Sequence, residues 1–466
     1  MARKSKRPFV RNLFRVVLAL FLVLAVWVVI MRSFKYEYNQ QADYKYDFSS
    51  MDSQTFELSL ENNRIQVGEM IKGFQTAFIE MDVNYTIKGF THEPKITMTA
   101  GNDTLFQNLE CRTKGVRYLN VSQLIQHEAG NIQFEFRGCK PKSASVKLIA
   151  YKNLDPSKEN ILILAPHPDD AEIAAYGLYA SNPKNTFIAT ITAGDAGSMN
   201  YNELYIDSTR HYIKKGEVRA WNSITIPMLA GVAPDNCINL GYFDASLRNM
   251  HDDTTTLAKS RYINTTNINL FRSKNCANFT DSLKSESTWR SLVNDMKYLL
   301  LKVKPTLIVS AYPALDYHFD HKFTTVALIQ AMQELNYQNC QLWLYTNHLP
   351  LTTMYPDGQI GSQISLPPHF ENEPIYFDKL FSFPLSKNLQ SDKVLALDAM
   401  NDLRPDTEYR YAKVLWDRTK QTFFDKLYLK ESDYFRRSVR SNELFFVIEG
   451  RNIFKSEIRS KIYGDL

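Results

Sequence analysis

Alternating strand-like and helix-like segments after residue 153 limit the fold of this 466-residue chain more than any other sequence feature. Short apolar runs suited to strands occupy residues 161–164 (ILIL), 186–193 (TFIATITA) and 306–312 (TLIVSAY). Segments with helical spacing occupy residues 170–180, 210–221 and 288–303. Strands joined by helices in this order form a parallel sheet with helices on both faces. We therefore predict an α/β fold with a mostly parallel sheet for residues 158–466.

Two further stretches of this domain have less regular patterns. Residues 393–466 are rich in aromatic and arginine side chains, and include YRYAKVLWDRTKQTFF at 409–424. We expect this part to form helices that pack on the α/β domain. The insert at 251–281 is polar and rich in Asn and Thr, which is typical of either a lid or a surface loop.

Residues 45–155 have a different pattern, in which apolar and polar residues alternate with period two. The clearest runs are FELSL (56–60), KITMT (95–99), IQFEF (132–136) and VKLIAY (146–151). Short alternating runs separated by turn-rich stretches predict a small antiparallel β-sandwich. Such a domain could bind a glycan or act as a spacer, and we favour the spacer.

The N-terminal residues 1–15 are basic, and the uncharged run from Val16 to Met31 follows them. This order predicts a transmembrane signal anchor with residues 1–15 in the cytoplasm. A buried helix of a soluble protein is disfavoured because the run has no amphipathic stripe. A cleavable signal peptide is the stronger alternative, but IMRSFKYEY at 30–38 lacks the small residues that cleavage requires.

Net charge and glycosylation signals bear on partners and location. The formal net charge is +5, but six basic residues fall within the first fifteen positions, so the remainder is nearly neutral and a nucleic-acid partner is disfavoured. Asn-X-Ser/Thr sequons occur at 84, 102, 120, 264 and 278. They would permit glycosylation in a eukaryotic lumen, yet a chain rich in these residues produces several by chance. We favour a single-pass membrane protein with an extracytoplasmic catalytic domain on the periplasmic or cell-surface side.

The five cysteines leave two alternatives open. An oxidising compartment would permit one pair between Cys111 and Cys139 and another between Cys237 and Cys276, with Cys340 left over. Five unpaired thiols are the other alternative. The spacing excludes zinc-finger and CxxC motifs.

Two clusters of acidic residues and histidines follow apolar strands. In LAPHPDDAE (164–172), His167, Asp169 and Asp170 come directly after the first strand of the α/β domain. Helix capping explains one aspartate there, but not a histidine with two adjacent aspartates. A second strand opens into Asp316, His318, Asp320 and His321. Because ligands bind beyond the carboxyl ends of parallel strands, the two clusters predict one shared catalytic metal site, suited to Zn²⁺ or to another divalent ion such as Mn or Fe.

These motifs resemble those of a known family, the PIG-L/LmbE-like zinc-dependent N-acetylglucosaminyl deacetylases. HPDDAE (167–172) and HFDH (318–321) are similar to the paired signatures of the family. Three intermediate blocks also resemble it: TAGDAG (192–197), KKGEVRA (214–220) and LGYFDASL (240–247). The resemblance covers residues 160–321 well and the region after 393 more loosely.

The resemblance implies roles for individual residues. Those it makes metal ligands are His167, Asp170 and His321. Asp169 would be the general base, His318 would stabilise the oxyanion or protonate the leaving amine, and Asp320 would orient a histidine.

Two positions are implied to bind substrate, and two positions depart from the family pattern. Lys214 stands where the family commonly has an arginine, and lysine lacks its bidentate fork. Asp244 would bind a sugar hydroxyl, with an ordinary loop aspartate as the alternative. Phe319 stands where the family usually has proline.

Together these features predict a membrane-anchored hydrolase with an N-terminal transmembrane helix, a small β-sandwich and a Rossmann-like catalytic domain. We expect it to remove N-acetyl groups from amino sugars of a glycolipid or polysaccharide, because a tethered enzyme gains most from a substrate held at the same surface. A glycan-binding or scaffold protein that has lost turnover is one alternative. A zinc hydrolase of a non-sugar amide is another.

Overall fold

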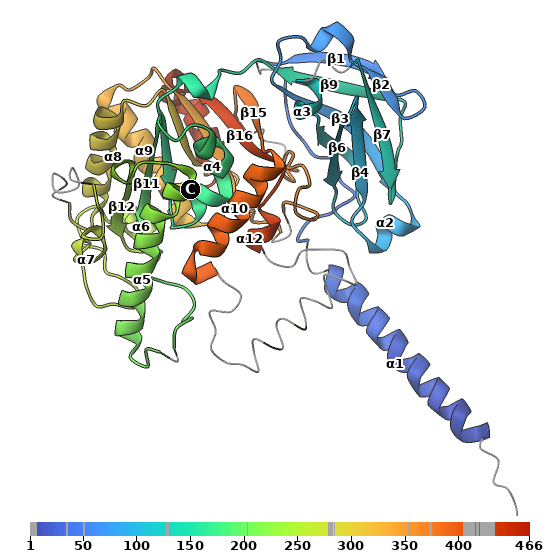
Figure 1. Ribbon diagram of the computed structural model, residues 1–466, viewed down its shortest axis with the longest axis horizontal. Coiled ribbons are helices and arrows are strands. Elements are labelled where there is room, and N and C mark those ends of the chain that lie inside the picture. Colours follow the sequence, from blue (N-terminus) through green and yellow to red (C-terminus); the bar gives the residue numbers. More distant parts are fainter. Residues whose placement is uncertain are drawn as a thin grey trace, which may run out of the picture.

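The computed structural model describes residues 7–33, 36–49, 52–126, 130–202, 204–277, 283, 285–352, 355–371, 375–403, 415, 419 and 434–466. These residues form an N-terminal helix, a β domain and a larger α/β domain (Figure 1).

Helix α1 (Arg7–Ser33) stands apart from both domains (Figure 1). The predicted signal anchor at 16–31 lies within α1, but the side chains beyond residue 25 fall outside the described residues. Within the described part of the chain, no helix combines the length and the apolar composition that a membrane crossing requires.

The β domain consists of two antiparallel sheets around one core. The first contains β1 (Gln54–Ser59), β9 (Ser145–Tyr151), β3 (Thr76–Tyr85) and β6 (Lys114–Asn120), in that order, with β8 (Cys139–Pro141) paired to β3. The second contains β2 (Arg64–Gln66), β7 (Asn131–Arg137), β4 (Lys95–Ala100) and β5 (Asp103–Asn108). Alternate side chains of both sheets, such as Ile79 and Met98, join one buried cluster, as period-two patterning requires. The short helices α2 (Ile87–Thr91) and α3 (Ser122–Ile125) lie in the connections.

The α/β domain is built on a seven-stranded mixed sheet, which confirms the predicted α/β class. Its strands are β10 (Ile161–Ala165), β11 (Thr186–Thr192), β12 (Cys237–Tyr242), β13 (Leu307–Ala311), β14 (Gln341–Tyr345), β15 (Lys379–Pro384) and β16 (Asn442–Glu449). Their order in the sheet is β12-β11-β10-β13-β14-β16-β15, and β16 runs in the direction opposite to the other six strands. Within this sheet, the chain first forms β10, then β11 and β12 on one side of it, and then crosses to form β13 on the other side of β10. Ligands bind at such a switch point, beyond the carboxyl ends of the two central strands.

Helices cover both faces of this sheet (Figure 1). The longer ones are α4 (Asp170–Ser181), α5 (Ser208–Thr225), α8 (Trp289–Val303), α9 (Phe319–Leu335), α10 (Lys387–Ala399) and α13 (Ser456–Tyr463). The shorter ones are α6 (Leu247–Asp252), α7 (Asn269–Arg272) and α12 (Tyr434–Arg437). Successive residues of β10 point to opposite faces: Leu162 joins the cluster under α8 and α9, and Ile163 joins the cluster under α4 and α10.

The C-terminal region differs from the expected set of helices. Residues 442–449 form strand β16 between β14 and the edge strand β15, and seven of its eight residues are buried. An apolar run of this length suits a buried strand as well as a helix, so its period alone could not separate the two. The predicted helix at 409–424 lies outside the described residues except at 415 and 419.

Neither of the two cysteine pairs that an oxidising compartment would permit forms in this structure. Cys139, Cys237, Cys276 and Cys340 carry free thiols, as the alternative of unpaired cysteines requires at these positions. Cys237 is fully buried in β12 whereas Cys276 is exposed. Burial raises the pKa of the Cys139 thiol to about 12, which keeps this group protonated.

The β domain is docked firmly on the α/β domain. Tyr118 and Ile149 of the β domain belong to the same buried cluster as the helices α8 and α9. Asn120 is fully buried at the junction, where its amide donates to the carbonyl of Ile364 at 3.0 Å and to Ser382 Oγ at 2.9 Å. The sequon at Asn120 therefore cannot carry a glycan in the folded protein.

A segment that we call the strap, residues 36–48, runs along this junction and contacts both domains. The backbone N–H of Tyr44 donates to Val116 of the β domain at 3.2 Å. On the other side, Tyr36 donates to Asp357 Oδ1 at 3.1 Å and Tyr46 donates to the carbonyl of Pro367 at 2.7 Å. The strap therefore links the two domains before the first strand of either begins.

Candidate metal centre

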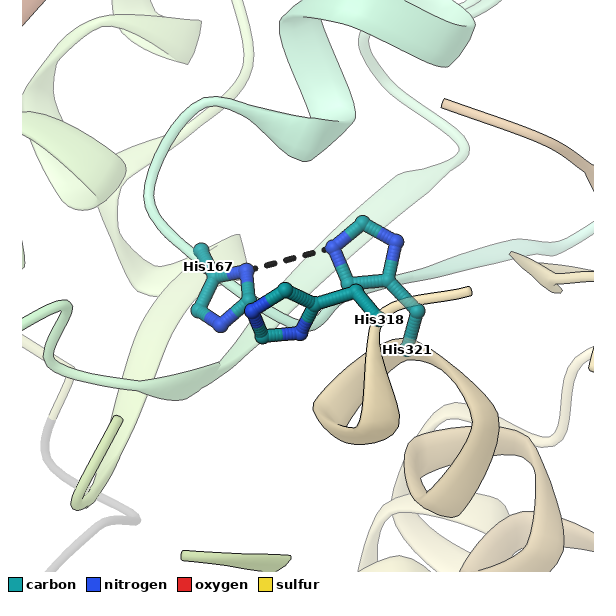
Figure 2. Close-up of side chains that lie close together, drawn as sticks. All are labelled: His167, His318 and His321. Atoms are coloured by element: carbon teal, nitrogen blue, oxygen red, sulfur yellow. Dashed lines mark hydrogen bonds between the residues drawn. The ribbon is translucent and has the colours of Figure 1, made fainter. Parts of the chain in front are cut away.

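The two predicted clusters meet at the carboxyl ends of the central strands. His167 lies in the turn between β10 and α4, and His321 lies in the first turn of α9, which follows β13. Figure 2 shows the rings of His167, His318 and His321 close together, with a dashed line joining those of His167 and His321. The topology of the sheet brings them together although more than 150 residues separate them in the sequence.

Three potential ligand atoms form a compact triangle. His167 Nδ1 lies 3.2 Å from His321 Nε2 and 3.3 Å from Asp170 Oδ2. The third edge, from His321 Nε2 to Asp170 Oδ2, measures 3.1 Å. Atoms held about 2.0–2.1 Å from a tetrahedral zinc ion lie roughly 3.3 Å apart, so this triangle has the size of a zinc ligand set. Two imidazole nitrogens and one carboxylate also match the donor types of catalytic zinc sites.

Further carboxylates hold the two histidine rings. His321 Nδ1 lies 3.0 Å from Asp316 Oδ2, so its Nε2 faces the triangle and can offer a lone pair there when the ring is neutral. His167 Nε2 lies 3.2 Å from Asp320 Oδ2 and 3.3 Å from Asp244 Oδ1. Asp320 also accepts hydrogen bonds from the backbone at 245 and 247, so it ties the histidine to the loop after β12.

This surplus of buried carboxylates favours a cation. Burial lowers the pKa of His321, but Asp170 and Asp316 outweigh burial and raise the pKa to about 10. Burial also lowers the pKa of His167, and Asp244 and Asp170 again outweigh it, so the pKa lies well above its usual value. The metal-free centre thus compensates its carboxylates with protonated imidazoles, and a divalent cation can replace those protons.

Asp169 sits beside the triangle in a strained backbone conformation. Its φ is 145° and its ψ is −26°, values that a residue with a side chain rarely adopts. Burial raises the pKa of its carboxyl to about 7, although the guanidinium of Arg219 lowers it in part. Arg219 Nη2 lies 3.2 Å from Asp169 Oδ2 and donates to the carbonyl of Pro168 at 3.0 Å. A carboxyl with a pKa near neutrality suits a general base.

His318 closes the triangle from the side of α9. Its ring centroid lies 4.6 Å from that of His167 and 5.1 Å from that of His321. Burial, together with the charges of His167 and His321, lowers the pKa of His318 to about 4. The ring is therefore neutral near pH 7, and its Nδ1 has no hydrogen-bond partner among the described residues.

Of the two predicted substrate-binding residues, only Asp244 borders the centre. Lys214 projects from α5 with its side chain 41% exposed, and its Nζ lies 2.6 Å from Glu217 Oε2. Arg219, one turn further along α5, is the cation that reaches the centre. Room for it comes from Gly194, whose φ is +64° and where an added Cβ would lie 2.7 Å from Arg219 Nε.

The loop after β14 also contributes to the centre, and the sequence analysis missed it. Asn347 Nδ2 donates to Asp170 Oδ1 at 2.7 Å, so it fixes the carboxylate of the triangle. The backbone N–H groups of Asn347 and His348 both donate to Asp316 Oδ2 at 3.2 Å. The His348 ring lies 5.0 Å from the His321 ring, and His348, Asp170 and His321 form another group that could hold a metal.

Comparisons with known proteins agree with this centre. Residues 162–332 match the family described as GlcNAc-PI de-N-acetylase, PIG-L. The chain is also similar to a protein of Bacillus subtilis (strain 168) named probable N-acetyl-alpha-D-glucosaminyl L-malate deacetylase 2. The two are 25% identical over 176 residues, which are 38% of this chain and 61% of that protein.

Solved structures give weaker likenesses. One is N,N'-diacetylchitobiose deacetylase from Pyrococcus horikoshii, which is 15% identical in sequence. The match covers 64% of this chain and 87% of that chain, with a TM-score of 0.33. Another is a deacetylase of the A40926 pseudoaglycone, which is also 15% identical in sequence. The match covers 63% of this chain and 98% of that chain, with a TM-score of 0.31.

Proposed function

Because residues 162–332 match the PIG-L family, we propose that this chain is a metal-dependent hydrolase that removes N-acetyl groups from amino sugars. The triangle of ligand atoms from His167, Asp170 and His321 carries the proposal, since its edges of 3.1–3.3 Å fit a zinc ion. The name of the similar Bacillus subtilis protein supports an N-acetylated amino sugar as substrate.

The metal is zinc in our proposal, with another divalent ion as the alternative. His167, Asp170 and His321 would hold it, and Asp316 and Asp320 would keep the two imidazoles in the required orientation. A zinc ion bound there would polarise the acetamide carbonyl and increase the acidity of a nearby water molecule.

Asp169 and His318 would carry out the proton chemistry. Asp169 accepts a proton from water as the water oxygen attacks the carbonyl carbon. His318 would donate a hydrogen bond to the oxygen on which negative charge develops, as an uncharged imidazole can. Asp169 then passes its proton to the nitrogen as the carbon–nitrogen bond breaks, which yields the free amine and acetic acid, and the acid loses its proton to water to give acetate.

Substrate class and location form a finer part of the proposal. We assign hydroxyl binding to Asp244, whose side chain is 13% exposed beside His167. The amino sugar would belong to a glycolipid or polysaccharide, and the N-terminal run at 16–31 would anchor the chain to a membrane with its catalytic domain extracytoplasmic. Equal activity on a free monosaccharide and on the conjugate would contradict this substrate class, and recovery in the soluble cell fraction would contradict the anchor.

The first experiment measures bound metal in the purified full-length chain and in its His321→Ala variant. We expect about one zinc ion per chain in the unmodified protein and none in the variant, because the variant loses one of three ligands. His251→Ala is the matched control, since this histidine is 43% exposed and lies outside the centre. The same samples are then assayed for acetate release from N-acetylglucosamine conjugates.

Two results would reject the proposal. A folded protein that binds no metal even after zinc is added would favour a scaffold that has lost turnover. A protein that binds zinc and hydrolyses simple amides but no amino sugar would be a hydrolase of a different substrate class.

A further inference from the structure

Two large aromatic side chains stand in solvent on either side of His318. Tyr317 is 55% exposed and Phe319 is 46% exposed, whereas His318 between them turns inward toward the metal centre. Exposed aromatic surface beside a catalytic centre commonly marks a binding surface, because burying it against a ligand is favourable. We call these two side chains the aromatic rim.

Contacts with its neighbours hold the aromatic rim in position. The guanidinium of Arg248 lies over the Phe319 ring, 4.2 Å from its centroid, and Arg248 Nε lies 3.6 Å from Asp252. Arg248 belongs to α6, and the chain just before it is tied to Asp320 through the N–H of Leu247 at 3.1 Å. The rim and the metal centre are therefore parts of one connected structure.

Tyr317 is held by the loop that follows β14. Its backbone N–H donates to the carbonyl of His348 at 3.0 Å, and its ring lies edge-on to the His348 ring at 5.9 Å. The two rim rings thus need little reordering when a ligand arrives, which lowers the entropic cost of binding.

The chemistry of the rim fits a sugar ring. One face of a pyranose carries mainly C–H groups and can lie flat on an aromatic ring, while its edge carries hydroxyls that need hydrogen-bond partners. Arg248 and Asp252 supply such partners next to Phe319. The same charged groups disfavour an acyl chain at this place, because a lipid tail would desolvate them without giving hydrogen bonds in return.

We propose that Tyr317 and Phe319 form a subsite for a second sugar residue, linked to the one whose acetamide lies at the metal centre. The inference rests on the proposed function and makes it narrower: the substrate is an oligosaccharide or polysaccharide chain. The rim then contributes binding energy that a monosaccharide cannot use.

Position 319 offers a clean variant, Phe319→Pro. Phe319 is the first residue of α9, where proline is well tolerated because the N–H of this position has no partner within the helix. The preceding residue has φ −74° and ψ 123°, which suits a residue before proline. The matched control is Phe90→Ala in the β domain, since Phe90 is 42% exposed and has Arg112 over its ring at 4.4 Å.

Calorimetric binding tests the subsite directly. The full-length, zinc-loaded Asp169→Asn protein is titrated with N-acetylglucosamine and with N,N',N''-triacetylchitotriose, with and without Phe319→Pro or Tyr317→Ala. We expect Phe319→Pro to weaken trisaccharide binding about fivefold to tenfold more than monosaccharide binding, because only the longer ligand reaches the ring. Tyr317→Ala should act in the same direction, and Phe90→Ala should change neither affinity.

Two results would overturn the subsite. Equal weakening for both sugars would make Phe319 a general support of the centre. An unchanged trisaccharide affinity with weaker binding of an alkyl N-acetylglucosaminide would assign the rim to a lipid. Failure of the proposed function looks different from both, because the parent protein would then bind neither sugar and the unmodified protein would release no acetate from either.

Discussion

Two of the groups of buried charges in this protein differ in how completely their side chains are partnered. In the β domain, the Arg117 side chain is 1% exposed, and its guanidinium N–H groups all have acceptors: Glu110 and the carbonyls of Gln40, Ala42 and Val116. At the metal centre, two imidazole nitrogens face each other at 3.2 Å, and His318 Nδ1 has no partner among the described residues. A buried charge with a complete set of partners holds structure, whereas a set left incomplete can bind something else.

The backbone makes the same distinction. Asp169 is held at a φ of 145° next to the centre, and such strain persists only where the surrounding structure enforces it. If the comparison is right, substitutions at Arg117 should affect folding, and substitutions at the centre should affect chemistry with little loss of stability.

The largest expected effect comes from Asp169→Asn. We expect kcat for deacetylation to fall about 10²-fold to 10⁴-fold because the base is lost. The melting temperature should stay the same or rise, since a neutral amide avoids the cost of burying a charged carboxylate. Burial of that carboxylate raises the Asp169 pKa to about 7. Acetate release, calorimetry and metal content together measure this. A large drop in melting temperature would instead make Asp169 a structural residue and erase the distinction.

Arg117→Met should destabilise the fold by about 3–5 kcal/mol, because it leaves Glu110 buried without its cation. Denaturant unfolding gives this free energy. The double variant Arg117→Met/Glu110→Leu is the control, and we expect it to recover most of the loss since neither charge remains. If the single variant lowered the free energy of unfolding by less than about 1 kcal/mol, the buried Arg117 would not have the structural role that the comparison assigns to it.

Stability against pH should separate the metal-free from the zinc-loaded protein. The folded-state pKa of His321 is raised to about 10, above the value of about 6.5 for an unfolded chain. The protonated ring therefore stabilises the metal-free fold fully below pH 6.5, and this contribution disappears as pH rises through about 10. In the zinc-loaded protein the imidazole is already deprotonated, so melting temperatures between pH 6.5 and 10 should decline less. The His321→Ala variant, freed of metal with a chelator, should lack the part of this decline that comes from His321. If the melting temperature falls equally steeply with pH in the presence and absence of zinc, the result would argue against zinc binding at His321.

The smallest effect is expected at Lys214. Its exposed pair with Glu217 is screened by solvent, so Lys214→Ala should change kcat/KM by less than about twofold. Arg219→Ala is the informative companion: its guanidinium lies 3.2 Å from Asp169, and we expect about tenfold loss or more. Steady-state kinetics on one amino-sugar conjugate decides between them. A larger effect at Lys214 than at Arg219 would return substrate binding to the position that the family resemblance implies.

The sequence predicted the heart of the centre because a simple rule of parallel sheets applies to it. His167 and His321 both follow buried strands, and carboxyl ends of neighbouring parallel strands lie at one edge. The same rule could have found Asn347, which comes two residues after the end of β14. Polar side chains beyond a third strand were the signal.

Other features depend on packing that no local pattern reports. Arg219 reaches Asp169 because α5 lies across the strand ends and because Gly194 leaves space for the guanidinium. Arg219 lies four residues after the buried Lys215, so both are on one face of the helix. The sequence does not say which face of the helix points inward. Strand β16 was missed since its order in the sheet is set by contacts with β14 and β15, which lie far away in the chain.

The strap has a consequence for the time course of synthesis. Tyr36 and Tyr46 each bond to residues 321 positions further along the chain. At about 5–20 residues per second, the ribosome needs on the order of tens of seconds to make that stretch. During this interval the β domain can form its own sheets, but the strap waits with its aromatic side chains uncovered. A nascent chain of this protein therefore passes through a long period in which chaperones, rather than its own second half, must cover the junction.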